Sequence, residues 1–195
     1  PHLVDYKERI RVNFQKIQVD FGDTQQNFYT GEGSVAIPGT IAGLIKAHKD
    51  NGQLPLHAIL EPAIDYAKNG IYLSEYQAYI NALVKPILIL TNDGEKLFTK
   101  NNKFLKKGDL FCNSKFSDFL IQISKEGSDF FYKGDCANLI EKYFSKEGYI
   151  TKKNLEDYKV IKRKPLLFKI NKNTIFTNPA PAFGAPNTNF GAAPA

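Results

Sequence analysis

The sequence contains no methionine and no tryptophan, and it has only two cysteines and three histidines. Two cysteines are too few for a disulfide scaffold, and without a C-x-x-C motif a zinc site is not expected. Cys112 and Cys136 are expected either as buried free thiols or, in an oxidising compartment, as a disulfide worth roughly 3 kcal/mol. No apolar run approaches the roughly 20 residues of a membrane helix, so no membrane span is predicted.

The chain begins at Pro1, without an initiating methionine, and no signal peptide is visible at its N-terminus. We therefore expect an interior piece of a longer protein or a processed chain. Hydrophobic residues make up 43% and charged residues 24% of the 195 residues, which is the usage of an ordinary globular domain. The length suffices for one domain with its own core.

The net charge is +6, but the lysines are scattered, and the only dense basic run is "KVIKRK" at Lys159–Lys164. Nucleic-acid binding requires basic side chains that gather on one face. A solvated strand with basic side chains explains this run better, so no nucleic-acid partner is predicted.

The stretch "GEGSVAIPGTIAGL" at Gly31–Leu44 matches a dinucleotide-binding pattern, G-x-G-x-x-[GA]. Such a turn requires a helix that begins near the second glycine, so that the helix amides face the pyrophosphate. Here Pro38 delays the helix, because proline is tolerated only in a first helical turn. This context argues against a nucleotide, and no cofactor or metal is predicted.

Patterns for a catalytic nucleophile are missing as well. The sequence has neither a G-x-S-x-G elbow nor an H-E-x-x-H motif. His48 lies on an apolar helix stripe, where a packed histidine is more common than a catalytic one. Residue types alone therefore indicate no catalytic residue in this chain.

Hydrophobic periodicity divides the chain into four parts and predicts an α+β fold that is mostly helical. Residues 1–37 form a strand and loop segment, 38–158 a helical region, and 159–178 a β-hairpin. Residues 179–195 are rich in Pro, Gly and Ala and are expected to be extended or disordered. Inside the helical region, residues 91–109 are predicted to be a polar loop.

Capping signals and apolar stripes predict the individual helices. Ser74 with Gln77 fits a capping box, and Asn113 and Thr151 are expected as N-caps. "PLLFKI" and "NTIFT" are expected to pair as the hairpin, joined by "NKN". The side chains predicted to face inward are Ile41, Leu44, Ile45, His48, Leu56, Ile59, Leu60, Ala63, Ile64, Ala67, Phe116, Phe119, Leu120, Ile123, Leu139, Ile140, Tyr143 and Phe144.

The order of several short segments is more specific than any single motif. From about Val19 to Gly184 the chain contains "VDFGD", "SVAIPG", "GQLP", "EPAIDYAKNG", "FYKGDCA", "TKKNLEDY" and "NPAPAFGA". This order resembles the large-subunit portion of the gamma-glutamyltransferase (gamma-glutamyl transpeptidase) family. The family pattern runs D-F-R-E, S-V-x-V-P-G, G-x-L-P, E-P-A-I-x-L-A-x-x-G, F-Y-x-G-x-x-A, T-x-x-D-L-x-x-Y and P-P-P-x-x-G-G.

The resemblance implies an N-terminal-nucleophile hydrolase fold, an αββα sandwich to which this chain contributes a mostly helical piece and a C-terminal hairpin. In the family, the precursor cuts itself into a large and a small subunit. The resemblance also explains "SVAIPG" as the turn into a long packing helix, in which Gly39 gives room and Pro38 sets the direction of the chain.

The implied activity is transfer of a gamma-glutamyl group from glutathione or a related compound to water or an amino acid. The implied nucleophile is the Thr at the new N-terminus of the small subunit, so that the catalytic Thr is not in this chain. Its own alpha-amine can act as the base. The implied location is the periplasm or the outside of the cell.

Two departures from the family pattern bear on substrate binding. The arginine of D-F-R-E, which in the family holds the substrate's alpha-carboxylate, falls on Gly22, and Asp23 replaces the glutamate. A guanidinium clamps a carboxylate with two hydrogen bonds, and glycine offers none. Either Arg11 or another cation substitutes, or glutamate binding is lost or altered. Asp23 is kept as a candidate substrate-binding residue, beside two alternatives: a non-catalytic relative, or an acylase of the same fold acting on another amide.

Overall fold

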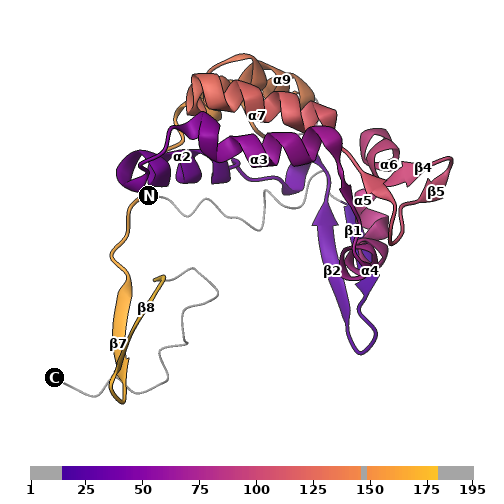
Figure 1. Ribbon diagram of the computed structural model, residues 1–195, viewed down its shortest axis with the longest axis horizontal. Helices are drawn as coiled ribbons and strands as arrows, with labels where there is room; N and C mark the ends of the chain where they lie inside the picture. Colours follow the sequence, from indigo (N-terminus) through magenta and orange to yellow (C-terminus); the bar gives the residue numbers. More distant parts are fainter. Residues whose placement is uncertain (1–14, 146–148, 180–195) are drawn as a thin grey trace. The chain divides into compact units, whose positions relative to one another are not determined.

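The structure is a computed structural model that describes residues 15–145 and 149–179. Helices predominate in these residues, and the strands form two-stranded antiparallel pairs (Figure 1). None of the helices in these ranges combines the length and apolar character that a membrane crossing requires. The chain divides into two compact units between Tyr158 and Lys159.

The elements of the first unit begin at Gln15. They are β1 (Gln15–Asp20), β2 (Gln25–Thr30), η1 (Glu32–Ser34), α2 (Thr40–Asn51), α3 (Leu56–Asn69), β3 (Ile71–Tyr72), α4 (Glu75–Leu83), α5 (Lys85–Leu88), α6 (Asn92–Phe98), β4 (Thr99–Lys100), β5 (Lys103–Phe104), β6 (Leu110–Phe111), α7 (Ser114–Glu126), α8 (Ser128–Tyr132), α9 (Asp135–Phe144) and α10 (Lys152–Glu156). The second unit contains β7 (Leu166–Ile170) and β8 (Asn173–Thr177), which pair as the predicted hairpin.

The predicted caps of three helices are confirmed. The Ser74 hydroxyl accepts the Gln77 amide at 3.2 Å, and the Gln77 side chain accepts the Ser74 amide at 2.9 Å. Asn113 caps α7 and Thr151 caps α10 through their side-chain oxygens. Each cap satisfies backbone donors that have no partner inside the helix.

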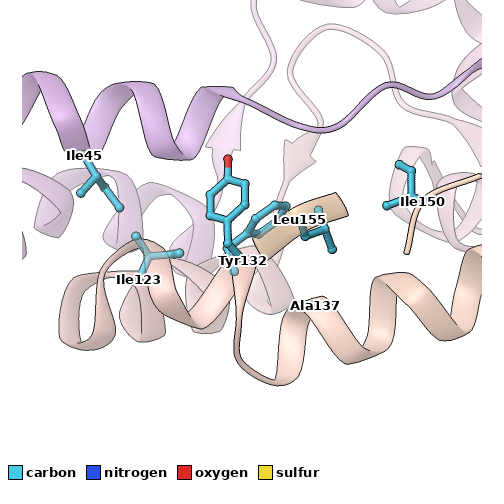
Figure 2. Close-up of a cluster of buried hydrophobic side chains, with 7 residues drawn as sticks. Ile45, Ile123, Tyr132, Ala137, Ile150 and Leu155 are labelled. Atoms are coloured by element: carbon cyan, nitrogen blue, oxygen red, sulfur yellow. The ribbon is translucent and has the colours of Figure 1, made fainter. Parts of the chain in front are cut away.

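The core of the first unit lies where α2, α7, α8, α9 and α10 meet (Figure 2). The apolar side chains of short helices meet there, because burying an apolar face of each helix removes it from water. Alongside this core, α3 packs lengthwise on α7 (Figure 1). The buried cluster consists of Ile45, Ile123, Phe131, Tyr132, Ala137, Ile150 and Leu155.

Several side chains predicted to face inward are exposed instead. Leu44 is 66% exposed on α2, and Leu139 and Tyr143 are 67% and 61% exposed on α9. On α9 the buried face is centred on Ala137, with Ile140 at its edge. The prediction was wrong there because a helix with apolar residues on two faces does not reveal from its own pattern which face is covered.

The polar stretch 91–109 was also wrongly predicted as a loop. It contains helix α6 and the two short strands β4 and β5. Asn101 and Asn102 join these strands with φ of 51° and 60°. Consecutive left-handed residues make a tight hairpin turn, and asparagine tolerates that conformation better than most residues.

Candidate functional site

The predicted substrate-binding position lies at the tip of the β1–β2 hairpin, in the loop 21–24. The Phe21 amide donates to the Thr24 carbonyl at 2.9 Å, and the Gly22 amide donates to Oδ1 of Asp20 at 2.8 Å. Gly22 has φ of 91°, which residues with a side chain rarely adopt. The turn itself therefore accounts for glycine at this position.

Asp23 is exposed in the same loop. None of the ion pairs between described residues includes Asp23. Arg11, the cation considered as a substitute for the family arginine, lies outside the described residues. Asp23 as a substrate-binding residue stays a prediction.

The turn explanation for Gly22 makes a quantitative prediction. We expect Gly22→Ala to lower the free energy of unfolding by about 1 kcal/mol, because alanine disfavours positive φ. No atom lies within 4 Å of the added Cβ, so the cost is conformational rather than steric. Asp23→Ala, the matched control in the same loop, should change stability by less than about 0.5 kcal/mol. Urea denaturation measures both, and equal effects of the two changes would contradict this account.

The second candidate feature is the turn of "SVAIPG", which leads into α2. The N-cap of α2 is Gly39, which has no side chain to satisfy the first helix amides. The Tyr132 hydroxyl takes the role of a capping side chain. It donates a hydrogen bond to the Pro38 carbonyl and accepts one from the Ala42 amide at 3.2 Å. Figure 2 shows the hydroxyl pointing at this segment. The start of α2 is therefore held from α8.

Gly39 is also needed for a steric reason. A Cβ at this position would lie 2.1 Å from the Tyr158 hydroxyl oxygen. The Tyr158 ring stacks on the Tyr132 ring, with centroids 5.6 Å apart and planes 10° apart. This contact confirms that Gly39 gives room. It also shows that the neighbour it makes room for is a tyrosine pair.

An apolar groove of about 350 Å³ lies beside α4. The polar side chains in its lining are Tyr76, Gln77 and Asn81, and the Gln77 amide is already engaged in the α4 capping box. A selective small-molecule site needs several convergent polar groups. The groove is therefore a weak candidate for a catalytic pocket. It is lined by Ile71, Leu73, Tyr76, Gln77, Ile80, Asn81, Phe98 and Phe111.

Neither cysteine is placed as a nucleophile. Cys112 and Cys136 are both free, and Cys112 is exposed rather than buried. Burial raises the pKa of the Cys136 thiol, which disfavours the reactive thiolate. The His48 Nε2 lies 2.8 Å from the Leu54 carbonyl oxygen, so this imidazole ties the end of α2 to the following loop. Within the described ranges, no three His, Cys, Asp or Glu side chains gather to hold a metal.

Comparison with known proteins decides the family. The profile of the gamma-glutamyltranspeptidase family matches residues 2–188, nearly the whole chain. This chain belongs to the gamma-glutamyltranspeptidase family. A curated glutathione hydrolase proenzyme from Pseudomonas aeruginosa is 31% identical in an alignment 194 residues long, which covers 94% of this chain and 33% of that protein. The chain thus spans about a third of the length of the curated relatives it matches.

Solved structures agree with this assignment. Helicobacter pylori gamma-glutamyltranspeptidase superimposes with a TM-score of 0.70 at 26% identity, covering 87% of this chain and 57% of that one. Cephalosporin acylase from Bacillus halodurans superimposes with a TM-score of 0.67 at 26% identity, covering 75% of this chain and 28% of that one. This chain therefore has the α+β fold of N-terminal-nucleophile hydrolases, of which it forms the mostly helical piece and a hairpin.

The range matched by the gamma-glutamyltranspeptidase family also contains a second stretch similar to the D-F-R-E pattern. Residues 5–8, "DYKE", keep the Asp and Glu of the D-F-R-E pattern, with an aromatic residue and a cation between them. Residues 20–23, "DFGD", keep only the Asp and the Phe. Tyr6 and Lys7 stand where the pattern has Phe and Arg, and each keeps the chemical type, aromatic and cationic. Identical residues alone therefore do not reveal the similarity. Residues 5–8 lie outside the described residues.

Proposed function

We propose that this chain is part of the large subunit of a gamma-glutamyltransferase or glutathione hydrolase. The observation that carries the proposal is the family match over residues 2–188 combined with coverage of only about a third of the curated relatives. The substrate is glutathione or another gamma-glutamyl compound, and its gamma-glutamyl group is transferred to water or to an amino acid. The partner is a small subunit that carries a Thr nucleophile.

The chemistry in this proposal is divided between two chains. The small-subunit Thr attacks the gamma-glutamyl amide, and its own alpha-amine takes the hydroxyl proton. The Thr oxygen then bonds to the carbonyl carbon, the C–N bond of the substrate amide breaks, and the leaving amine takes the proton from the alpha-amine, so an acyl-enzyme forms. Water or an amino acid releases the glutamyl group. The name "proenzyme" of several relatives supports autoprocessing of a single precursor into the two subunits.

The role proposed for this chain is to bind the glutamyl end of the substrate. The residues proposed for it are Asp5–Glu8, in which the Lys7 ammonium takes the place of the family arginine. A lysine pairs with a carboxylate as a point charge rather than as a two-pronged clamp. This assignment and the one at Gly22 and Asp23 make different predictions.

Substitution separates the two assignments. We expect Lys7→Met to lower kcat/KM for a gamma-glutamyl anilide by about 10- to 100-fold, because a hydrogen bond to a charged group is lost. Lys7→Arg should restore most of that loss, and Asp23→Ala should leave kcat/KM unchanged. If Asp23→Ala lowered kcat/KM and Lys7→Met did not, the glutamyl site would be assigned to the tip of the β1–β2 hairpin instead.

The test of the proposed function starts from the protein purified from its natural source. Intact mass and N-terminal sequencing should reveal a second chain that begins with Thr. The two-chain protein should then cleave a chromogenic gamma-glutamyl anilide. A single chain without such a partner would identify a truncated or non-catalytic relative. Fractionation of the cells tests the proposed periplasmic or extracellular location.

A second candidate is an acylase of the same fold that acts on another amide. The likeness to cephalosporin acylase favours it, at the same 26% identity as the likeness to the gamma-glutamyltranspeptidase. An amide substrate without an alpha-carboxylate needs no cation at residue 7. Hydrolysis of a non-glutamyl amide that is insensitive to Lys7→Met would select this alternative.

A further inference from the structure

The segment 96–107 carries five lysines and no acidic residue, and it lies at one end of the first unit (Figure 1). It contains the end of α6, the β4–β5 hairpin and the start of the turn that leads to β6. Other residues separate these lysines along the sequence, but the hairpin folds the segment back on itself and brings them together. They are Lys96, Lys100, Lys103, Lys106 and Lys107, and all five are exposed.

Two of these lysines stand directly opposite each other on the hairpin. Lys100 pairs with Lys103, and Thr99 pairs with Phe104. Successive side chains alternate between the two faces of a strand. The Phe104 ring stacks on the Phe98 ring with centroids 6.4 Å apart, so Lys100 and Lys103 occupy the face turned away from this contact. Like charges directly opposite each other destabilise a strand pair, and an anion beside them would offset the repulsion.

The carboxylates of the surrounding segments leave most of this charge unbalanced. Glu75 pairs with Lys107 at 2.7 Å. Oδ2 of Asp109 accepts the backbone amide of Lys106 at 2.9 Å and so stabilises the turn. Two further carboxylates lie in the first turn of α6, at the opposite end of that helix from the hairpin. No ion pair between described residues includes any of the other four lysines.

Exposed apolar side chains adjoin the lysines. Tyr72 and Leu110 pair across β3 and β6 and are 74% and 39% exposed. The Leu73 amide donates to the Asp109 carbonyl at 2.9 Å, and the Gly108 amide donates to the Leu73 carbonyl at 2.8 Å. These two hydrogen bonds hold the lysine-bearing turn next to Tyr72. A tyrosine has an apolar ring and a polar hydroxyl, which suits the boundary between water and an apolar medium.

The kinds of side chain present select among anionic partners. Every cation of the segment is a lysine, so the arginine fork that clamps a single carboxylate or phosphate is missing from it. The half-buried rings of Phe98 and Phe104 stack on each other and offer no platform for nucleic-acid bases. β4 and β5 have two residues each, too short an edge to be extended by another strand. Lysines beside an exposed tyrosine fit the anionic headgroups of a lipid bilayer, where each lysine adds separately to binding.

We propose that this end of the protein binds the surface of a membrane that contains anionic phospholipids. The lysines contact the headgroup phosphates, and Tyr72 with Leu110 lies at the boundary between headgroups and acyl chains. The proposal is independent of the proposed function, because it uses none of the residues assigned to the glutamyl site. The basic patch that makes this contact consists of Lys96, Lys100, Lys103, Lys106, Tyr72 and Leu110.

The experiment measures co-sedimentation of the full-length protein with vesicles of equal parts phosphatidylcholine and phosphatidylglycerol. The test variant carries Lys100→Gln, Lys103→Gln and Lys106→Gln. In about 50 mM salt we expect it to bind about 100-fold more weakly than the unchanged protein, about fivefold for each lysine. Vesicles of phosphatidylcholine alone should bind neither protein. About 500 mM salt should remove most of the binding of the unchanged protein, because it shortens the Debye length.

Two controls test the charge itself. Arginine at the same three positions keeps the charge and should bind the vesicles like the unchanged protein, and loss of binding there would contradict the proposal. Glutamine at Lys49, Lys125 and Lys142, which are exposed on α2, α7 and α9, changes the net charge equally and should leave binding unchanged. Equal losses for the two glutamine variants, or no binding of the unchanged protein, would overturn the proposal. Lysine-dependent binding to single-stranded DNA or poly-aspartate without binding to vesicles would overturn it in favour of that partner.

The apolar contact and the proposed function are tested separately. Tyr72→Ser should weaken vesicle binding at both salt concentrations, whereas Tyr143→Ser, at a 61% exposed position on α9, should not. Equal effects of these two changes would overturn the contact assigned to Tyr72. Cleavage of a gamma-glutamyl anilide in solution should be the same for the protein and the first glutamine variant. A protein that binds vesicles but cleaves no gamma-glutamyl substrate would contradict the proposed function and still support membrane binding.

Discussion

Gly39→Ala is expected to lower the free energy of unfolding by about 2–3 kcal/mol, the range of severe overpacking. The added Cβ would lie 2.1 Å from the Tyr158 hydroxyl oxygen and 2.8 Å from the adjoining ring carbon. The Tyr158 ring cannot move away freely, because it stacks on the buried Tyr132 ring. The change should therefore disturb the start of α2 as well as the tyrosine pair.

A second glycine of the same helix provides the control. Gly43 has no atom within 4 Å of its built Cβ and lies inside α2. We expect Gly43→Ala to stabilise the protein by about 0.5–1 kcal/mol, because alanine loses less conformational freedom in a helix. Urea denaturation of both variants gives the comparison. Similar changes for the two glycines would show that the contact with Tyr158 does not constrain residue 39.

Tyr132→Phe is expected to lower the free energy of unfolding by about 2 kcal/mol. The change keeps the ring in the core and removes the hydroxyl, which leaves the Pro38 carbonyl and the Ala42 amide without this partner. Each unpaired buried polar group costs about 1–3 kcal/mol, and partial access of water lowers the total. The control is Tyr143→Phe on α9, where the side chain is 61% exposed and the change should be near neutral.

The same residue predicts a pH dependence. Burial raises the pKa of Tyr132 above its ordinary value of 10.0; the hydrogen bond from the Ala42 amide opposes this shift, and the neighbouring Tyr158 adds to it. The folded state therefore holds this proton more tightly than the unfolded chain. The contribution of the hydroxyl to stability is complete below pH 10 and is lost as pH rises through the folded pKa. The stability difference between the protein and Tyr132→Phe should be constant below pH 10 and shrink as pH rises above 10, and a constant difference throughout would contradict the assignment.

Local signals predicted the ends of the elements well. The Ser74–Gln77 capping box and the caps at Asn113 and Thr151 are confirmed, because each involves groups only three residues apart. The β7–β8 hairpin is confirmed for the same reason, since a two-residue connection fixes its register. Interactions of such short range are contained in the sequence pattern.

Two features of the candidate site could not be found this way. The cap of α2 comes from Tyr132, which accepts a hydrogen bond from an amide 90 residues away in the sequence. The hydrophobic periodicity of the sequence does not predict this contact. The tip of the β1–β2 hairpin was compared with a substrate-binding motif because it shares two letters with it, whereas its geometry is that of a turn. The choice of buried face on α9 likewise depended on which helices cover it.

The sequence by itself determined the family, the helix caps and the C-terminal hairpin. These depend on residue order or on contacts within a few positions. Only the tertiary structure decided that Gly39 lies against Tyr158, that Gly22 serves a turn, and that Leu139 and Tyr143 face away from the core. The physical reason is that burial and steric contact are properties of pairs of segments, and packing brings those pairs together across separations that no local pattern records.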